Sequence, residues 1–349
     1  MVLVAAALFF LGVMTIATRR MGALALILVV ILASVLESFF GVLVYVLHGA
    51  ARAYGALFNP NHHAAMVVMG IPMLIAGIWA LKVSHPRFRH GALGGENPLI
   101  LLVAVLLMMV MSWLTALSRG SLLAGILVMG GWLAYEMRAA AREGGTEFSR
   151  HEKMRFGVAA SAAVVLLVLM GLATVLDSYA RRYTSAVVLG DLNRLDKARA
   201  TITGLLEAPL TGLGPAGAEQ ALNRFSRIST ERIPIHTHND WVEWLAELGI
   251  PAAIVAGMLL WKFAAAFLRE WRRREESSSR RGIIGRAAAA GALIAFLHAA
   301  ADFHLRVPLV AFQFFSLVAV ALGPGTRRMI PQRGQSFPRS SVGMEKFLE

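Results

Sequence analysis

The distribution of hydrophobic residues along the chain predicts a series of membrane-spanning helices. A spanning helix needs about 20 predominantly apolar residues, and nine stretches of this sequence meet that requirement. They are approximately residues 2–18, 21–38, 61–81, 98–117, 121–137, 156–176, 251–268, 287–302 and 307–323. The pattern therefore predicts an all-α polytopic membrane protein with about nine transmembrane helices.

Basic residues between these stretches predict the orientation of the chain. The first stretch has no basic segment before its apolar run, so it is not a signal peptide. Arg19 and Arg20 follow it and place its C-terminal end on the cytoplasmic side. Alternation from there puts residues 82–97, 138–155, 269–286 and the tail inside, and most Lys and Arg residues fall in these regions. The remaining connections are expected on the external face.

Four regions follow from this topology. Residues 1–176 hold the first six helices, 177–247 form one long external loop, 248–323 hold the last three helices, and 324–349 form a basic cytoplasmic tail that we expect to be disordered. Loops this long without structure are uncommon, so we expect a small helical subdomain. A helix over Asp191–Glu207 is predicted, with an apolar face and a break at Pro209 and the glycines after it. That face would comprise Leu192, Leu195, Ile202 and Leu206.

Composition excludes several other classes of protein. Hydrophobic residues make up 57% of the chain, charged residues only 16%, and the mean hydropathy is +0.62. These values argue against a soluble multidomain enzyme, a disordered regulator and a coiled coil. The net charge of +13 does not indicate a nucleic-acid partner, because most of the cations belong to the cytoplasmic side. The chain has no cysteine, which excludes disulfides and thiolate metal sites.

The segment Ile235–Pro251 has the strongest local pattern. Asp240 is a suitable N-cap with Glu243 three residues later, and Gly249 and Pro251 suit a helix end followed by a new helix. This predicts a short interfacial helix that turns into the membrane, with His238 and Asn239 at its start. The two histidines of the segment, at 236 and 238, are explained equally well as ordinary polar loop residues.

Two further segments suggest anion binding on the external side. Asn59, Pro60, Asn61 and His62 mark a helix start whose free N–H groups favour anions, although a plain helix cap is the simpler explanation. Ser118, Arg119 and Gly120 interrupt a long apolar run, so the chain must fold back there. The guanidinium of Arg119 suits bidentate contact with phosphate. An anchor that reaches the interface is the alternative.

A last cluster lies between the final two helices. His298, Asp302, His304 and Arg306 fall close together, and i,i+4 ion pairs of Asp302 with His298 and Arg306 are the simpler account. No metal site is expected, because the metalloprotease pattern is absent and the histidines lack an evident third ligand. The topology places these residues on one face with the arginines of the long loop, which are Arg181, Arg182, Arg194 and Arg199.

Taken in order, these segments resemble the O-antigen ligase and O-antigen polymerase superfamily of bacterial envelope glycan enzymes. The resemblance rests on Asn59-Pro60-Asn61-His62, on Ser118-Arg119-Gly120, on the loop Pro209–Pro215, on the spacing of His238-Asn239 from Gly249, and on the turn His298–Pro308. Members commonly have more spans and an internal N-terminus, so helices that precede this segment in the family are expected to be missing here.

The resemblance implies a metal-independent glycosyltransferase in the bacterial inner membrane, without a cofactor. It would move a glycan from undecaprenyl diphosphate to a hydroxyl of lipid A core or of another glycan at the periplasmic face, where the long loop lies. His238 is the expected base or acceptor-orienting residue, with Arg119 and Arg194 as the diphosphate clamp. The expected substrate-binding residues are Asn59, Asn61, His62, Arg181, Arg182, Arg199, Asn239, Asp302, His304 and Arg306. A transporter or flippase of lipid-linked glycans is the alternative.

Overall fold

The computed structural model describes residues 2–84, 98–142, 186–227, 236–276 and 279–323. Within these ranges every regular element is a helix, which confirms the expected all-α class for the described part of the chain. Eight of the nine predicted spans coincide with helices, and the stretch 156–176 lies outside the described residues. The eight are α1 (Val2–Ala17), α2 (Arg20–Leu47), α3 (Pro60–Ser84), α5 (Pro98–Thr115), α6 (Arg119–Arg142), α10 (Asp240–Glu276), α11 (Ser279–His298) and α12 (Pro308–Leu322).

Four helices in the described ranges are long and apolar enough to cross a membrane. They are Arg20–Leu47, Pro60–Leu81, Arg119–Ala139 and Asp240–Ala266. Shorter apolar helices accompany them at Leu8–Ala17, Ile100–Thr115, Gly282–His298 and Pro308–Leu322. The count of nine spans and the sidedness of the loops remain predictions.

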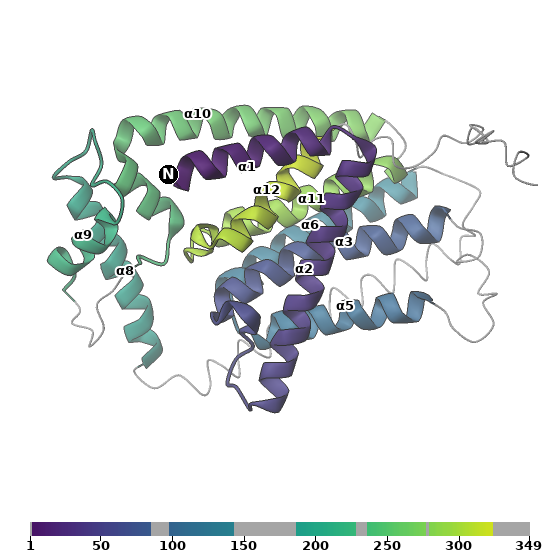
Figure 1. Ribbon diagram of the computed structural model, residues 1–349, viewed down its shortest axis with the longest axis horizontal. Coiled ribbons are helices and arrows are strands. Elements are labelled where there is room, and N and C mark those ends of the chain that lie inside the picture. The colour runs from purple at the N-terminus through teal and green to yellow at the C-terminus, as the bar shows by residue number, and fades with distance from the viewer. Residues whose placement is uncertain (1, 85–97, 143–185, 228–235, 277–278, 324–349) are drawn as a thin grey trace, which may run out of the picture.

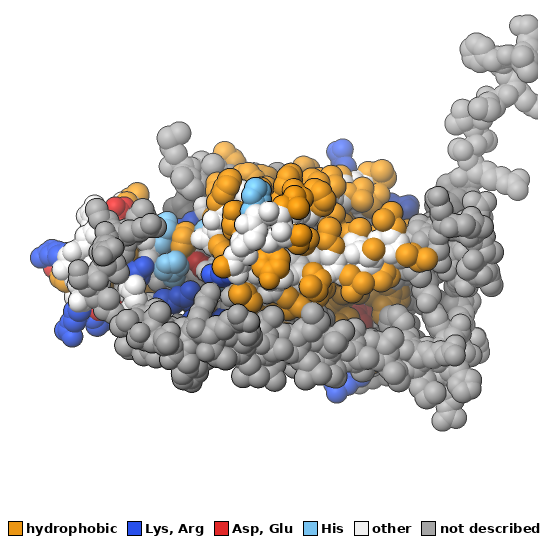
Figure 2. Space-filling model, turned by 90° about the horizontal axis from the view of Figure 1, so that it is seen from below, with side chains coloured by type: hydrophobic (Ala, Val, Ile, Leu, Met, Phe, Trp, Pro, Cys, Tyr) orange, Lys and Arg blue, Asp and Glu red, His pale blue; other side chains and the backbone are white. Residues whose placement is uncertain are grey.

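The long apolar helices form a bundle, and the remaining elements gather at one end of it. In Figure 1, α3, α5, α6, α11 and α12 run in a common direction, while α8 (Ala186–Leu205) and α9 (Gly217–Phe225) lie at the left end. In Figure 2, hydrophobic side chains cover the bundle, and histidine and charged side chains collect at the end that carries α8 and α9. Histidine and charged side chains are therefore concentrated at this end in the view of Figure 2, although basic side chains also lie elsewhere.

Small residues bring α3 and α11 together in the centre of the bundle. A side chain on Gly291 would meet the carbonyl oxygen of Met69 at 2.5 Å, so the two backbones are in close contact. Buried alanines of α11 pack beside this position against methionines of α3. Close approach through small residues is the usual way in which helices associate in lipid, and it fixes the turn at the end of α11 relative to the start of α3.

Helix α2 is longer than predicted, and the acidic residue near its predicted end has a partner inside the bundle. The predicted span ends at residue 38, yet residues 39–47 are also almost all apolar and the helix continues to Leu47. Glu37 is only 4% exposed and pairs with His63 of α3 at 2.9 Å. A carboxylate with a partner inside the protein does not end a membrane helix.

Arg286 was expected in a cytoplasmic connection, and the structure corrects this. Helix α11 begins at Ser279, and Arg286 lies inside it with 1% exposure. Its Nε and Nη2 atoms donate to the two carboxylate oxygens of Glu136 in α6, at 2.6 and 2.8 Å. This buried ion pair joins α6 to α11.

The helix predicted over Asp191–Glu207 is confirmed as α8, but its predicted packing face is wrong. Leu195 and Leu206 are each 69% exposed and Ile202 is 43% exposed. The opposite face packs instead, because a side chain on Gly204 would meet Ala221 of α9 at 2.5 Å. Small residues permit this close contact, so the larger leucines are left outside.

Two 3-10 turns, η1 (Gly55–Leu57) and η2 (His304–Arg306), complete the described elements. The first precedes α3, and the second precedes α12. Both lie at the end of the bundle that holds the polar cluster.

Candidate functional site

The start of α10 is built by Asn239. Its Oδ1 accepts hydrogen bonds from the N–H groups of Trp241 and Val242, each at 3.1 Å. Asn239 is therefore the N-cap, and the prediction of Asp240 in that role is wrong by one residue. The short helix ends as predicted, because Gly249 has φ 77° and ψ 171° and interrupts α10 before Pro251.

Asp240 instead ties α10 to the turn between α11 and α12. Its N–H donates to the carbonyl oxygens of Ala299 and Asp302, at 3.0 and 3.1 Å. Its side chain accepts from the N–H of Leu305 at 2.9 Å. These contacts hold residues 299–305 against the start of α10.

His238 lies between these two segments. It has a left-handed backbone with φ 58°, which is unusual for a residue other than glycine, and its side chain is 30% exposed. Its Nδ1 faces Oδ1 of Asp302 at 3.4 Å, a long contact. Because an ionised carboxylate only accepts, Nδ1 carries the hydrogen, and Nε2 of the neutral ring is left with a lone pair.

Asp302 is 1% exposed, and its surroundings favour the ionised form. Burial would raise the pKa of its carboxyl group. The hydrogen bond from His238, the nearby ring of His298 and the N–H of Phe303 outweigh burial and hold this pKa well below its usual range. Asp302 therefore orients His238 as a buried anion.

Phe303 contacts three histidines and was not singled out by the sequence. Its ring stacks on His236 with centroids 4.0 Å apart, and it meets His62 and His238 edge-to-face at 4.8 and 5.1 Å. His62 is 6% exposed. The ring thus brings the start of α3 and the His236–His238 segment to one place.

Glu243 is buried beneath the same segment and supports it. Its carboxylate accepts from the N–H and the hydroxyl of Thr237 and lies 3.2 Å from Nδ1 of His236. Glu243 is 1% exposed. The carboxylate therefore orients His236 as Asp302 orients His238.

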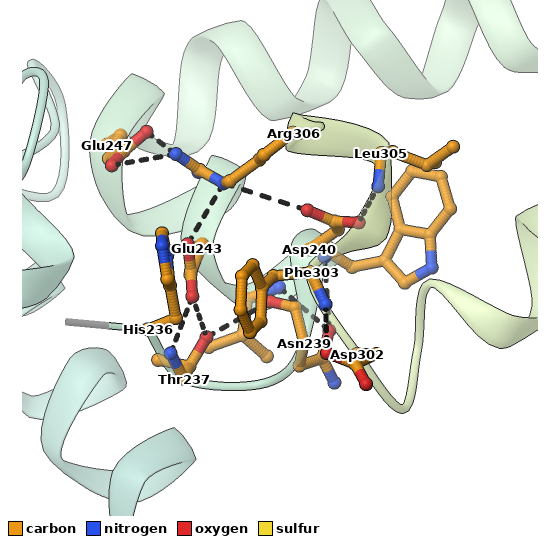
Figure 3. A network of polar contacts seen from close by, with 12 residues as sticks. His236, Thr237, Asn239, Asp240, Glu243, Glu247, Asp302, Phe303, Leu305 and Arg306 are labelled. Atoms are coloured by element: carbon orange, nitrogen blue, oxygen red, sulfur yellow. Dashed lines mark hydrogen bonds and ion pairs between the residues drawn. The ribbon is translucent and has the colours of Figure 1, made fainter. Parts of the chain in front are cut away.

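Arg306 contacts three acidic side chains of α10, and Figure 3 shows how they lie around its guanidinium. Its guanidinium lies 2.9 Å from Glu243, makes two contacts with Glu247 at 2.8 and 3.2 Å, and lies 3.6 Å from Asp240. The predicted i,i+4 pair with Asp302 is not formed. Helix α11 ends at His298, so helical spacing does not apply to residues 302–306.

His304 is buried on the inner side of this turn. Its ring is fully buried, stacks on His298 with centroids 4.4 Å apart, and lies 3.1 Å through Nε2 from the carbonyl oxygen of Ala295. Burial, and next the neighbouring His298, hold the pKa of His304 well below its usual value. The carbonyl contact assigns the hydrogen of the neutral ring to Nε2.

The predicted fold-back at Ser118-Arg119-Gly120 is confirmed, because α5 ends at Thr115 and α6 begins at Arg119. The Ser118 hydroxyl is 3.4 Å from Nε2 of His298. A side chain on Gly120 would meet His298 and Ala301 within 3 Å, so α6 starts directly against the end of α11. Arg119 is thereby placed one residue from the contact with His298.

Helix α8 contributes basic residues to the cluster around His298. Arg194 is close enough to act electrostatically on His298 and on Lys197. Burial, and next the charge of Arg194, lower the pKa of Lys197 against the attraction of Glu243. The structure therefore gathers His62, His236, His238, Asp302, His304, Arg306 and Arg194 around one cluster.

Other predicted site residues make contacts within the protein. Asn59 caps α3 through Oδ1, which accepts from the N–H of Asn61 at 2.8 Å, and Asn61 accepts from Arg52 at 2.9 Å. Arg199 donates to Asp196 and to the carbonyl oxygen of Phe225, and so joins α8 to the end of α9. Substrate contacts by these residues stay predictions. Arg181 and Arg182 lie outside the described residues.

The glycine loop after α8 completes the C-terminal end of the short helix. The N–H groups of Leu213 and Gly214 donate to the carbonyl oxygens of Ala246 and Glu247, at 2.8 and 3.1 Å. A side chain on Gly212 would meet the Glu247 carbonyl at 2.3 Å. The loop 209–214 therefore holds the helix that carries His238 at its start.

No group of three or more His, Asp or Glu side chains in the described ranges is arranged to hold a metal ion. Sequence reasoning missed Phe303, Arg52 and the support that Thr237 and Glu243 give to the histidines. Phe303 carries no polar signal, and the other contacts join segments that are far apart in the chain.

These features define a polytopic helical protein with a histidine–carboxylate site at one end of its bundle. Residues 99–257 match the family model described as O-antigen ligase, which confirms the resemblance to the O-antigen ligase and polymerase superfamily. The matched segment includes Arg119, the loop 209–215 and His238. A search of curated proteins gave no significant match.

Proposed function

We propose that the protein is a metal-independent glycosyltransferase that moves a glycan from undecaprenyl diphosphate to an acceptor hydroxyl. The acceptor oxygen bonds to the anomeric carbon, and the bond from that carbon to the diphosphate oxygen breaks. The diphosphate leaves with the electron pair, and a base takes the acceptor proton. The family match and the His238–Asp302 pair support this reaction.

His238 is the proposed base. The contact of its Nδ1 with Asp302 leaves Nε2 to receive the proton from the acceptor. The ring is partly exposed while its partner is buried, which is the arrangement expected of a residue that meets substrate on one side only. Asp302 then stabilises the imidazolium that forms.

Arg119 and Arg194 are the proposed diphosphate clamp. Arg119 follows Ser118, whose hydroxyl lies 3.4 Å from Nε2 of His298, and Arg194 acts electrostatically on His298 from α8. Positive groups placed where charge develops on a leaving phosphate stabilise the transition state. Arg306 is less suited to this task, because the carboxylates of Glu243 and Glu247 already contact its guanidinium.

The remaining candidates are proposed to contact the sugar or the diphosphate. His62 and Asn239 are the nearest of them to His238, through Phe303 and through the chain. Asn59, Asn61, Arg181, Arg182, Arg199, His304 and Arg306 stay in the proposal as weaker candidates. We place the site at the periplasmic face of the bacterial inner membrane, with lipid A core or a growing glycan as the acceptor.

Purified protein incubated in detergent with lipid-linked glycan and acceptor tests this function. Product should form without a second compartment, which a transporter or flippase would not achieve. His238→Ala should lower the rate by about 10²–10⁴-fold, and Arg119→Ala or Arg194→Ala by about 10²–10³-fold.

Two surface residues supply matched controls. His48 is exposed at the end of α2, and Arg224 of α9 is 67% exposed and forms an ion pair with Glu207. His48→Ala and Arg224→Ala should keep full activity. Full activity of His238→Ala would remove His238 from the mechanism, and glycan movement across vesicles without product would favour the transporter.

A further inference from the structure

Three buried polar side chains from three different helices form a continuous chain of contacts outside the site described above. Nδ1 of His63 in α3 is 2.9 Å from Oε1 of Glu37 in α2, and Nε2 is 2.9 Å from the hydroxyl of Ser112 in α5. That hydroxyl donates to the carbonyl oxygen of Ser38 at 3.0 Å. His63 and Ser112 are completely buried, and Glu37 is 4% exposed.

Hydrogen-bond counting determines how this network is protonated. Ser112 has one hydroxyl hydrogen, which goes to Ser38, so its oxygen accepts from Nε2–H of His63. One further proton lies between Nδ1 and Glu37, and the two groups together carry no net charge whichever atom holds it. A neutral, fully bonded network can be buried at little cost, whereas its separate members could not.

The order Ser–His–carboxylate is also that of a hydrolytic triad, but this serine is not placed to act as a nucleophile. Its oxygen has no exposed surface, and its hydrogen is committed to a backbone carbonyl. A side chain on Gly41 would meet the His63 ring at 2.3 Å and Ser112 at 2.6 Å. Protein atoms therefore surround the serine, and the network has a structural role rather than a hydrolytic one.

The network also contacts η1, the turn that precedes α3. The second carboxylate oxygen of Glu37 accepts from the N–H of Ala56 in η1 at 3.2 Å. Gly55 has φ 55°, and a side chain there would meet Glu37 at 2.1 Å and His63 at 2.6 Å. Only glycine fits this position, so the turn is built around the carboxylate.

Fixing His63 also fixes its neighbour. Successive residues of a helix point about 100° apart, so a His63 ring held by α2 and α5 sets the direction of His62. The His62 ring meets Phe303 at 4.8 Å, and Phe303 meets His238 at 5.1 Å. The network is therefore two rings away from the proposed base.

We propose that Glu37, His63 and Ser112 form a positioning network, which fixes the first turn of α3 and thereby the place of the His62 ring on Phe303 beside His238. This inference rests on the proposed function, since it assigns the network to the geometry of that site. None of the three residues is a catalytic residue, because none touches substrate.

The test compares variants that keep or remove the hydrogen bonds. In Glu37→Gln the amide oxygen still accepts from Ala56 and the amide nitrogen donates to Nδ1 of His63, so transfer should stay near wild type. Glu37→Leu should lower kcat by about 10–100-fold with little change in KM, as expected for a misplaced catalytic group. Ser112→Ala is a smaller change and should give a weaker loss of kcat.

A second buried network, which joins α2 and α3 to α12, provides the control. Ser34 donates to the carbonyl oxygen of Met66 and accepts from Gln313 at 2.8 Å, and Ser34 is completely buried. Ser34→Ala should lower the thermal stability without a selective loss of kcat. Equal kcat in Glu37→Leu and Ser34→Ala, with active wild type, would overturn the positioning role.

A measurement that needs no activity separates this inference from the proposed function. The chain has no cysteine, so Ala56→Cys, at an exposed position in η1, gives a single site for a nitroxide label. The label should be immobile in Ala56→Cys alone and when Ala56→Cys is combined with Glu37→Gln, and mobile when Ala56→Cys is combined with Glu37→Leu. If wild type makes no product, the proposed function fails. Independently of that result, an immobile label in Glu37→Leu would overturn the positioning network.

Discussion

The guanidinium of Arg306 lies 2.9 Å from the buried carboxylate of Glu243, although the two residues come from different elements of the chain. Arg306 belongs to η2 before α12, and Glu243 to the first turn of α10. Glu243 in turn supports Thr237 and His236. One ion pair therefore connects η2, the turn between α11 and α12, with the segment that carries His238.

Arg306→Ala should strongly destabilise the protein. The change leaves the carboxylate of Glu243 buried without its cation, and breaking a buried pair in this way typically costs about 3–5 kcal/mol. Thermal unfolding in detergent measures the effect. Arg224→Ala breaks an exposed pair and should cost no more than about 1 kcal/mol. Similar losses in the two variants would contradict the role assigned to Arg306.

Phe303→Ala should lower transfer more than it lowers stability. The ring holds three histidines through its faces and edges, and loss of that support lets His238 move. A displacement of about 1 Å can reduce a rate about 10²-fold. Phe303→Leu should retain part of the activity, because it keeps the bulk but not the flat ring.

Kinetics in detergent would separate the two effects. The expected result is a lower kcat in Phe303→Ala together with a cooperative unfolding transition. Unchanged kcat in folded Phe303→Ala would show that the contacts between these rings do not position the base.

The helices could be predicted from the sequence because their signals are local. Runs of apolar residues, the asparagine before Pro60 and the Gly249–Pro251 break each depend on neighbours in the chain, and the structure confirms them. The burial of Glu37 within α2 could not be predicted, because its partner lies 26 residues away.

The candidate site was only partly predictable for the same reason. His238 and Asp302 were both identified, but their contact crosses 64 positions of the chain. Helical spacing assigned Arg306 to Asp302, whereas the turn after His298 directs it to α10. Phe303 has no charge or hydrogen-bonding side chain, so only the folded chain shows its contacts with the histidines.

Three glycine substitutions should separate backbone strain from crowding. Gly249 has φ 77° and a Cβ would lie 2.6 Å from the Gly212 nitrogen, whereas Gly214 has φ 76° with open space around it. Gly214→Ala should cost about 1–2 kcal/mol for the left-handed conformation, and Gly249→Ala should cost more. Gly257→Ala, in open space with no positive φ, should be neutral or slightly stabilising.

Thermal unfolding of the three variants in one detergent gives this order directly. Equal effects at Gly214 and Gly249 would show that the loop 209–214 does not press on the end of the short helix. The same helix has His238 before its first residue, so a loop that holds its C-terminal end also helps to hold His238.

His304 should make the protein less stable as the pH falls below about 6.5, the usual pKa of histidine. The pKa of His304 is held well below that value in the folded protein, first by burial. The unfolded chain therefore takes up a proton that the folded chain refuses, and each pH unit in this window costs up to about 1.4 kcal/mol. Asp302 adds little there, because its lowered pKa matters only below the ordinary range of a carboxyl group, near 3.9. His304→Gln keeps a donor for the Ala295 carbonyl and should reduce the slope of the stability curve between pH 7 and pH 5, roughly the window set by the unfolded pKa. His48→Gln, at the exposed end of α2, should follow the wild-type curve, and a wild-type slope in His304→Gln would show that this ring is not kept neutral by the fold.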